Sequence, residues 1–218
     1  MPDDDNLLIQ RDYQPISGRT ILVFVAWLLP GAALAILFLP RTHILLILGG
    51  LYAVAVVAVV LAVLPRGRQA LAALALRPAP WRPIVIGCAV TVALSIGASQ
   101  IGPEVQGMKE VKELVTERGA LLPSLVLLAG LAPLAEELVF RGLLYGWLEG
   151  RWGWKVAYAV SSVAFAVAHF EPAHILLVLP LAAVFGWLRW RTNSLLPSLA
   201  AHALNNGVSV LTLVWLNV

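Results

Sequence analysis

The sequence contains few charged residues and almost no cysteine. Only 12% of its 218 residues are charged, whereas a soluble domain carries about a quarter. Hydrophobic residues make up 60%, and the mean hydropathy is +0.87. The single cysteine, Cys88, excludes an internal disulfide. The shortage of charge indicates that lipid is the main solvent, and it predicts that residues 1–218 form a single membrane domain.

The sequence also lacks the pattern of a cleavable signal peptide and that of a nucleic-acid-binding surface. The first residues, MPDDDN, are acidic and lack the basic start of a cleavable signal peptide. The net charge is +3 and the pI is about 9.4, but the basic residues are scattered between apolar runs. This distribution is typical of loops at a membrane surface, so we expect no nucleic-acid partner.

Long apolar runs predict an all-α, polytopic bundle of about seven transmembrane helices, within a range of six to eight. A spanning helix needs about 20 mostly apolar residues. The predicted spans are residues 20–39, 44–64, 83–101, 120–147, 154–169, 174–190 and 195–216. Residues 66–83 and 102–119 are expected to be interfacial, and the second of these has the pattern of an amphipathic helix.

The lysines and arginines predict the orientation of the bundle. With the N-terminus in the cytoplasm, ten of them lie on the cytoplasmic side and four on the other. The ten are Arg11, Arg19, Arg66, Arg68, Arg77, Arg82, Arg151, Lys155, Arg189 and Arg191, and the four are Arg41, Lys109, Lys112 and Arg118. The positive-inside rule therefore predicts a cytoplasmic tail at residues 1–19, in what we expect to be a prokaryotic cytoplasmic membrane.

Two of the twelve acids lie deep in a predicted span, and such groups are costly in lipid and are often functional. These are Glu136 and Glu137. Because Glu137 and Arg141 are four residues apart on one helix, they can form an ion pair. Glu136 points about 100° away and is free to face a cavity. A structural ion pair explains Glu137 and Arg141 well, but an unpaired Glu136 favours a function.

Two other predicted spans carry polar faces. Phe165 and His169 are four residues apart on one of them, and His202 and Asn206 on another. At about 1.5 Å per residue, Glu136, His169 and His202 lie roughly 10–22 Å from the cytoplasmic helix ends. We therefore expect these groups to meet near mid-membrane, in a site that opens toward the cytoplasm. Taken singly, His169 could cap a helix, and His202 with Asn206 could bond neighbouring helices.

The three motifs together resemble the CPBP family, which groups type II CAAX prenyl proteases with bacteriocin-processing enzymes and bacterial Abi proteins. Its pattern is EExxxR, then FxxxH, then HxxxN or HxxxD. Here these motifs are Glu136-Glu137-Leu-Val-Phe-Arg141, Phe165-Ala-Val-Ala-His169 and His202-Ala-Leu-Asn-Asn206. The resemblance covers residues 120–210 and implies that they form the catalytic core. The N-terminal spans carry no motif of this kind.

The resemblance implies an intramembrane endopeptidase that uses a glutamate-activated water. By this analogy Glu136 is the general base, His169 helps to hold the water, and His202 and Asn206 stabilise the oxyanion. Glu137, Arg141 and Phe165 then support the site. A carboxylate base and uncharged N–H donors suit hydrolysis where water is scarce. We expect no metal, although Glu136, His169 and His202 could form a His₂Glu zinc site.

Other protease classes and other functions fit the sequence less well. No HExxH or GxSxG motif occurs, and no aspartate follows Asp12, which excludes an aspartyl dyad. A proton- or ion-coupled transporter using the same polar groups is an alternative, but no inverted repeat is visible. A non-catalytic membrane scaffold is another. The expected partners are the lipid bilayer and a substrate that is a membrane protein or a lipidated peptide. Family substrates include prenylated tails, leader peptides, bacteriocin precursors and sorting tails.

Overall fold

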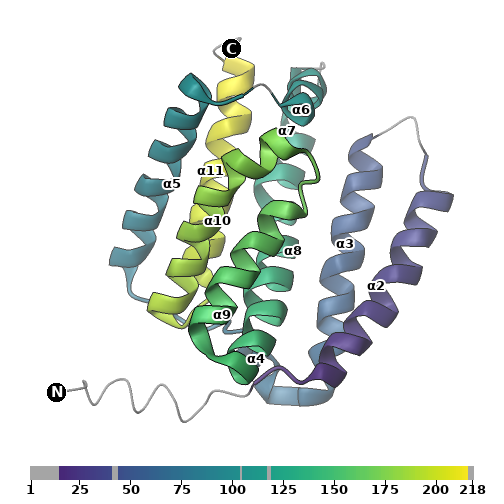
Figure 1. The fold of residues 1–218 in the computed structure, drawn as a ribbon. Helices are drawn as coiled ribbons and strands as arrows, with labels where there is room; N and C mark the ends of the chain where they lie inside the picture. Colours follow the sequence, from purple (N-terminus) through teal and green to yellow (C-terminus); the bar gives the residue numbers. More distant parts are fainter. Residues whose placement is uncertain (1–14, 41–43, 104, 117–118, 216–218) are drawn as a thin grey trace.

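The computed structural model describes residues 15–40, 44–103, 105–116 and 119–215, and within these ranges the chain is helical, with no strand. Most of the predicted tail at 1–19 lies outside the described residues. The α-helices are α2 (Gly18–Phe38), α3 (Ile44–Val63), α4 (Ala70–Ala73), α5 (Trp81–Ile101), α6 (Gln106–Thr116), α7 (Leu121–Ser124), α8 (Ala132–Glu137), α9 (Tyr145–Val167), α10 (Pro172–Thr192) and α11 (Leu196–Trp215). A 3-10 helix, η1 (Leu64–Gln69), follows α3. The prediction of an all-α membrane bundle is confirmed (Figure 1).

Helix α2 shows how local sequence sets the length of a span. Ser17 precedes it in extended conformation, and the Ser17 side chain accepts a hydrogen bond from the backbone N–H of Thr20. Such a cap satisfies a backbone donor that the first turn leaves unpaired. The 21 residues of α2 then extend about 31 Å, which matches the hydrocarbon thickness of a bilayer.

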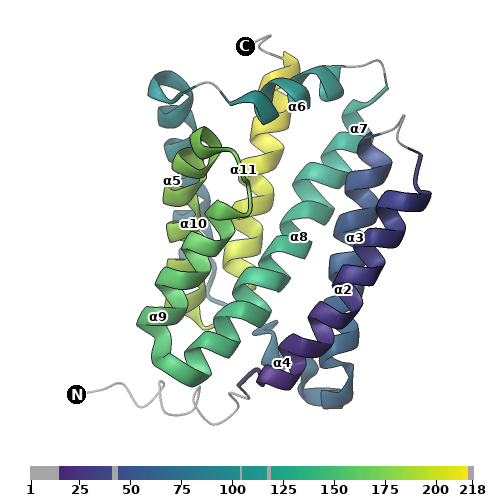
Figure 2. The same cartoon turned by 45° about the vertical axis from the view of Figure 1, so that its right-hand side comes forward.

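One long helical stretch, residues 121–167, supplies two of the predicted spans. It bends back at Gly153, whose φ of 79° and ψ of 171° are not helical. Glycine tolerates this backbone conformation because it has no Cβ. Figure 2 shows the chain descending through α8 and returning upward through α9. The predicted boundary between the fourth and fifth spans therefore falls at a sharp turn.

The same stretch is not a regular α-helix around the glutamate pair. Two π-helical segments, η2 (Leu125–Leu131) and η3 (Leu138–Leu144), lie directly before and after α8. Glu136 and Glu137 are the last two residues of α8. A π-helical turn contains an extra residue and therefore changes which side chains face the neighbouring helices. Such turns occur often at functional sites.

Five helices of the described chain are long and apolar enough to cross a membrane, counting residues 121–167 once. Helix α11 is not among them, and His202, Asn205 and Asn206 lie near its middle. It nevertheless runs beside α5, α10 and η2 through the bundle (Figures 1 and 2). All seven predicted spans are thus helical, and α11 is a polar member of the bundle.

The packing order brings the N-terminal half of the chain against the glutamate pair. Helix α2 packs on α3, and α3 in turn packs on α8, η2 and η3. On the other side α11 packs on η2 and α8, while α9 and α10 pack together. Helix α8 therefore lies between α3 and α11, and its polar side chains can meet residues from both.

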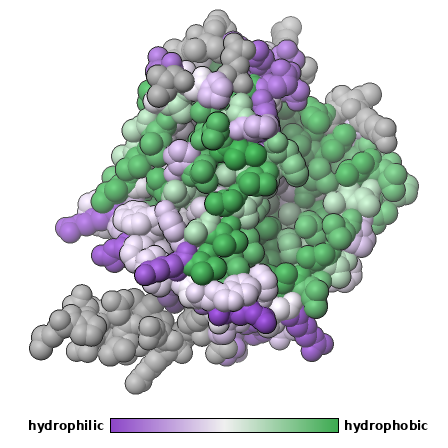
Figure 3. Space-filling view, in the orientation of Figure 1, coloured by the Kyte–Doolittle hydropathy of each residue, from purple (hydrophilic) through white to green (hydrophobic). Residues whose placement is uncertain are grey.

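The two ends of the bundle differ in charge. Helix α6 lies at the end opposite the start of α2, and α4 lies near that start (Figures 1 and 2). The arginines of η1, of the α9 turn and of the last turn of α10 lie at the α2 end, which we name the arginine-rich end. Figure 3 shows apolar side chains between two hydrophilic zones, as a bilayer requires.

Candidate active site

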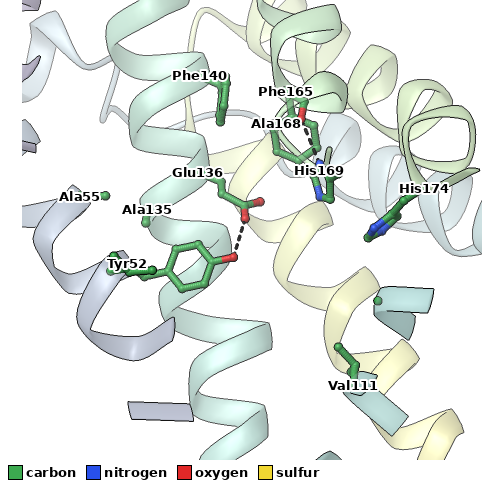
Figure 4. A pocket seen from close by; sticks show the side chains of 12 residues that line it. Tyr52, Ala55, Val111, Ala135, Glu136, Phe140, Phe165, Ala168, His169 and His174 are labelled. Atoms are coloured by element: carbon green, nitrogen blue, oxygen red, sulfur yellow. Dashed lines mark hydrogen bonds between the residues drawn. The ribbon is translucent and has the colours of Figure 1, made fainter. Parts of the chain in front are cut away.

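Glu136 projects into a cavity of about 480 Å³. Its carboxylate atom Oε1 accepts a hydrogen bond of 3.0 Å from the Tyr52 hydroxyl of α3. Its other oxygen, Oε2, lies 3.6 Å from Nε2 of His202. The side chain keeps 18% of its surface exposed, so a water molecule or a substrate can reach it. Figure 4 shows Glu136 and Tyr52 meeting in the cavity, with His169 across from them in the turn after α9.

Glu137 points away from the cavity and is fully buried. Its Oε1 lies 3.2 Å from Nη1 of Arg141, which is also fully buried. Arg141 donates a hydrogen bond to the carbonyl oxygen of Ala182 and stacks 4.2 Å from the ring centroid of Phe165. The structure therefore separates the two glutamates, with Glu137 in a helix-packing ion pair and Glu136 facing the cavity.

His202 lies between the two carboxylates. Its Nδ1 is 3.1 Å from Oε1 of Glu137, and its Nε2 faces Glu136. The ring stacks on Phe185, with centroids 4.7 Å apart, and is 4% exposed. Both ring nitrogens lie next to carboxylate oxygens. His202 thus couples the buried ion pair to the carboxylate in the cavity.

His169 lines the same cavity from the C-terminal end of α9. Its Nδ1 is 3.0 Å from the carbonyl oxygen of Phe165. Because a carbonyl only accepts, Nδ1 must carry a proton, and in the neutral ring Nε2 is then the acceptor. That arrangement leaves Nε2 able to accept a hydrogen bond from a water molecule. His174 packs against the ring, with centroids 4.6 Å apart.

Asn206 does not line this cavity. Its side-chain Nδ2 donates a hydrogen bond of 3.0 Å to the carbonyl oxygen of Leu128, in the π-helical segment η2. The neighbouring Asn205 accepts a hydrogen bond from Ser95 of α5. The structure thus brings Glu136, His169 and His202 around one site, whereas Asn206 has a hydrogen-bond partner in a flanking helix.

The alternative zinc site can be compared with this geometry. Within the described ranges, no three His, Cys, Asp or Glu side chains are grouped so that they could hold a metal ion. His169 Nδ1 faces a carbonyl and His202 Nδ1 faces a carboxylate, which are partners that metal-binding histidines also have, so these contacts do not distinguish a zinc centre from a metal-free site.

The cavity adjoins the α6 end of the bundle. Its wall includes Gly107 and Val111 of α6, His174 in the first turn of α10, and Tyr52. The cavity therefore lies nearer the α6 end than the arginine-rich end of the bundle (Figure 2), whereas the sequence predicted a site that opens toward the cytoplasm. Counting residues along straight helices predicted similar depths for Glu136, His169 and His202. It did not include α6, which covers the cavity at one end of the bundle.

Glu171 holds α6 over the cavity. Its two carboxylate oxygens accept hydrogen bonds from the backbone N–H groups of Gln106 and Gly107, at 2.8 and 3.2 Å. These two bonds hold the pKa of the Glu171 carboxyl below its ordinary value of 4.5. A carboxylate at the start of a helix also interacts favourably with the helix dipole. The connection after α9 is thereby tied to α6.

We expect this contact to depend on pH. Because the folded-state pKa is lowered, the stabilisation is fully present above about pH 4.5 and is lost as the pH falls through the lowered value. Replacing Glu171 with alanine should increase amide hydrogen exchange at Gln106 and Gly107 at pH 7. Acidification should do the same in the wild type only. The control Glu113→Ala removes a carboxylate from α6 itself, and equal exchange in both variants would contradict the role of Glu171.

Comparison with known proteins shows which family this part of the chain resembles. Residues 118–208 match the family described as type II CAAX prenyl endopeptidase Rce1-like. The match covers 91 of the 218 residues. The matched region contains all three motifs, so the resemblance to the CPBP family is confirmed. The Rce1-like region begins just before α7 and ends within α11, and therefore includes Glu136, Glu137, His169 and His202.

Two curated relatives are each similar to less than half of this chain. The Bacillus subtilis (strain 168) protein "Putative membrane peptidase YdiL" is 25% identical over 107 residues, which is 49% of this chain and 42% of that protein. The Lactococcus lactis subsp. lactis (strain IL1403) protein "UPF0177 protein YxdF" is 34% identical over 74 residues, 34% of this chain and 40% of that protein. The matches thus span about two-fifths of each relative. No solved structure matches significantly.

Two contributions to the site lie outside the Rce1-like region. Tyr52 and the cavity wall from α6 come from the part of the chain in which no motif is visible. One sequence signal could have identified Tyr52, because it is the only polar side chain in the stretch 44–63. A single hydroxyl in a span otherwise made of aliphatic residues and glycine favours a specific partner in a neighbouring helix.

Proposed function

We propose that this chain is an intramembrane endopeptidase that hydrolyses a peptide bond with a water molecule activated by Glu136. The observation that carries the proposal is the carboxylate of Glu136 in a 480 Å³ cavity, with His169 lining the same cavity. The match of the Rce1-like region to a family of endopeptidases supports it, as does a relative whose name includes membrane peptidase. The proposal needs no metal ion.

The residues of the site have complementary roles in this mechanism. Glu136 takes a proton from the water while the water oxygen attacks the substrate carbonyl. When the tetrahedral intermediate collapses, the C–N bond breaks and Glu136 gives this proton to the leaving amine. Nε2 of His169 holds the water by accepting its second hydrogen bond. His202 stabilises the Glu136 carboxylate from one side, and the buried Glu137–Arg141 pair fixes His202. The oxyanion role predicted for Asn206 is not part of this mechanism, because Asn206 lies outside the cavity lining and bonds to Leu128.

A comparison of protein termini in cells tests the proposal directly. Membrane-protein N- and C-termini are sequenced by mass spectrometry in cells with the wild-type chain and with the Glu136→Gln variant. We expect a small set of termini that appear only with the wild type. Identical termini in both strains, together with proton transport by the purified wild-type protein in liposomes, would favour the transporter alternative.

We also propose that the arginine-rich end faces the cytoplasm, so that the cavity opens on the opposite half of the membrane. The difference in positive charge between the two ends supports this orientation. The substrate is then a membrane-associated segment whose cleaved bond lies on the non-cytoplasmic side, such as a leader peptide or a sorting tail. A prenylated cytoplasmic tail is the opposite case and requires the inverted orientation.

Cysteine labelling distinguishes the two orientations. In a Cys88→Ala background, single cysteines replace the exposed residues Glu113 of α6 and Arg68 of η1. We expect a membrane-impermeant maleimide to label Glu113→Cys in intact cells, and Arg68→Cys only after the membrane is opened. The reverse pattern would show that the cavity opens toward the cytoplasm and would favour prenylated substrates.

A further inference from the structure

Tyr52 is the one contribution of the N-terminal half that touches the carboxylate of Glu136 in the described structure. Its hydroxyl donates a hydrogen bond of 3.0 Å to Oε1. The residue lies in α3, 84 positions before Glu136 and outside the Rce1-like region. From the distance and from the shared cavity, we propose that Tyr52 is a positioning residue for the catalytic base, a role that rests on the proposed peptidase function.

The contact is held by packing on both sides. Helix α3 packs on α8, and Leu51, Tyr52 and Ala55 all line the cavity wall. Ala135, the neighbour of Glu136, is buried, so the backbone that carries the carboxylate is fixed. Tyr52 is half-buried, and Figure 4 shows its ring reaching from α3 to the carboxylate. The hydroxyl is therefore held on a rigid ring, and few rotatable bonds connect that ring to the backbone of α3.

The chemical consequence concerns the orientation of the carboxylate. A free glutamate side chain rotates about its terminal bond, and its two oxygens exchange places. Here Tyr52 holds Oε1 while His202 lies 3.6 Å from Oε2, so each oxygen has its own neighbouring side chain. Each carboxylate oxygen accepts more than one hydrogen bond, which leaves a lone pair for the attacking water. A base held in one orientation loses less freedom when it reaches the transition state.

Replacing Tyr52 with phenylalanine removes only the hydroxyl. We expect kcat for peptide cleavage to fall about 10- to 100-fold, as for the loss of a hydrogen bond to a charged group, while KM stays unchanged. A purely structural role for Tyr52 would instead lower the unfolding temperature of Tyr52→Phe and leave the kcat of the folded protein unchanged.

The matched control is Tyr158→Phe, which removes a hydroxyl from α9, and we expect its kcat to equal that of the wild type. A second measurement does not depend on activity. In the infrared difference spectrum between wild type and Tyr52→Phe, we expect a shifted carboxylate band that disappears when Glu136 is glutamine.

The outcomes separate this inference from the proposed function. Unchanged kcat and an unchanged carboxylate band in Tyr52→Phe would overturn the role of Tyr52 while leaving the peptidase intact. Absence of cleavage by the wild type would overturn the peptidase, and the infrared band would then still decide whether Tyr52 positions Glu136.

Discussion

Replacing Glu136 with glutamine should lower the kcat/KM of peptide cleavage about 10²–10⁴-fold, the usual contribution of a general base. Glutamine has nearly the same shape and can still accept the hydrogen bond from Tyr52, but it cannot take a proton from water. The buried Glu137–Arg141 pair is untouched by the change, so the variant should fold normally. The measurement is cleavage of a substrate segment by purified protein in lipid nanodiscs, with the unfolding temperature as a check.

The control for this prediction is Glu149→Gln. Glu149 of α9 lies 3.9 Å from Arg189 of α10, and its neutralisation should leave kcat/KM unchanged. Incubation of the wild type with a metal chelator should leave the rate unchanged as well. Retention of more than a tenth of the activity by Glu136→Gln would show that another group activates the water, and inhibition by the chelator would revive a metal mechanism.

Replacing Glu137 with leucine should destabilise the protein by about 3–5 kcal/mol. The change leaves the fully buried Arg141 without its carboxylate partner, and it removes the group that faces Nδ1 of His202. An uncompensated charge in a buried site is strongly unfavourable. The measurement is equilibrium unfolding in mixed micelles, followed by circular dichroism.

The double variant Glu137→Leu/Arg141→Leu tests the cause. If the loss comes from the uncompensated charge, removing Arg141 as well should recover much of the stability, because an apolar pair can replace a buried ion pair at little cost. The double-mutant cycle would then give a large coupling energy between the two positions. Additive losses would show instead that each side chain stabilises the fold through separate contacts, such as those of Arg141 with Ala182 and Phe165.

Local spacing within one helix was enough to predict several features of the site. Glu137 and Arg141 lie one turn apart, so their pairing follows from helix geometry alone. The same spacing turns Glu136 to a different side, and the structure places it in the cavity. The hydropathy pattern also determined the all-α class and the membrane setting, because apolar runs of this length can be buried only in lipid.

Contacts between helices could not be predicted in this way. The three motifs named Glu136, His169, His202 and Asn206, but they did not show that His202 lies between both glutamates or that Asn206 bonds to Leu128. The relative depth and rotation of two spans depend on tilt and on irregular turns. The π-helical segments on both sides of α8 are irregularities of this kind, and simple counting along an α-helix does not include them.

The amino-acid sequence by itself thus determined the membrane setting, the helical class, the family resemblance of residues 120–210 and the different orientations of Glu136 and Glu137. These features depend on composition and on neighbours within four residues. Only the tertiary structure decided that Tyr52 reaches Glu136 and that α6 covers the cavity at the end away from the arginines. Both depend on side chains that lie far apart in the chain, and helix packing alone brings them together.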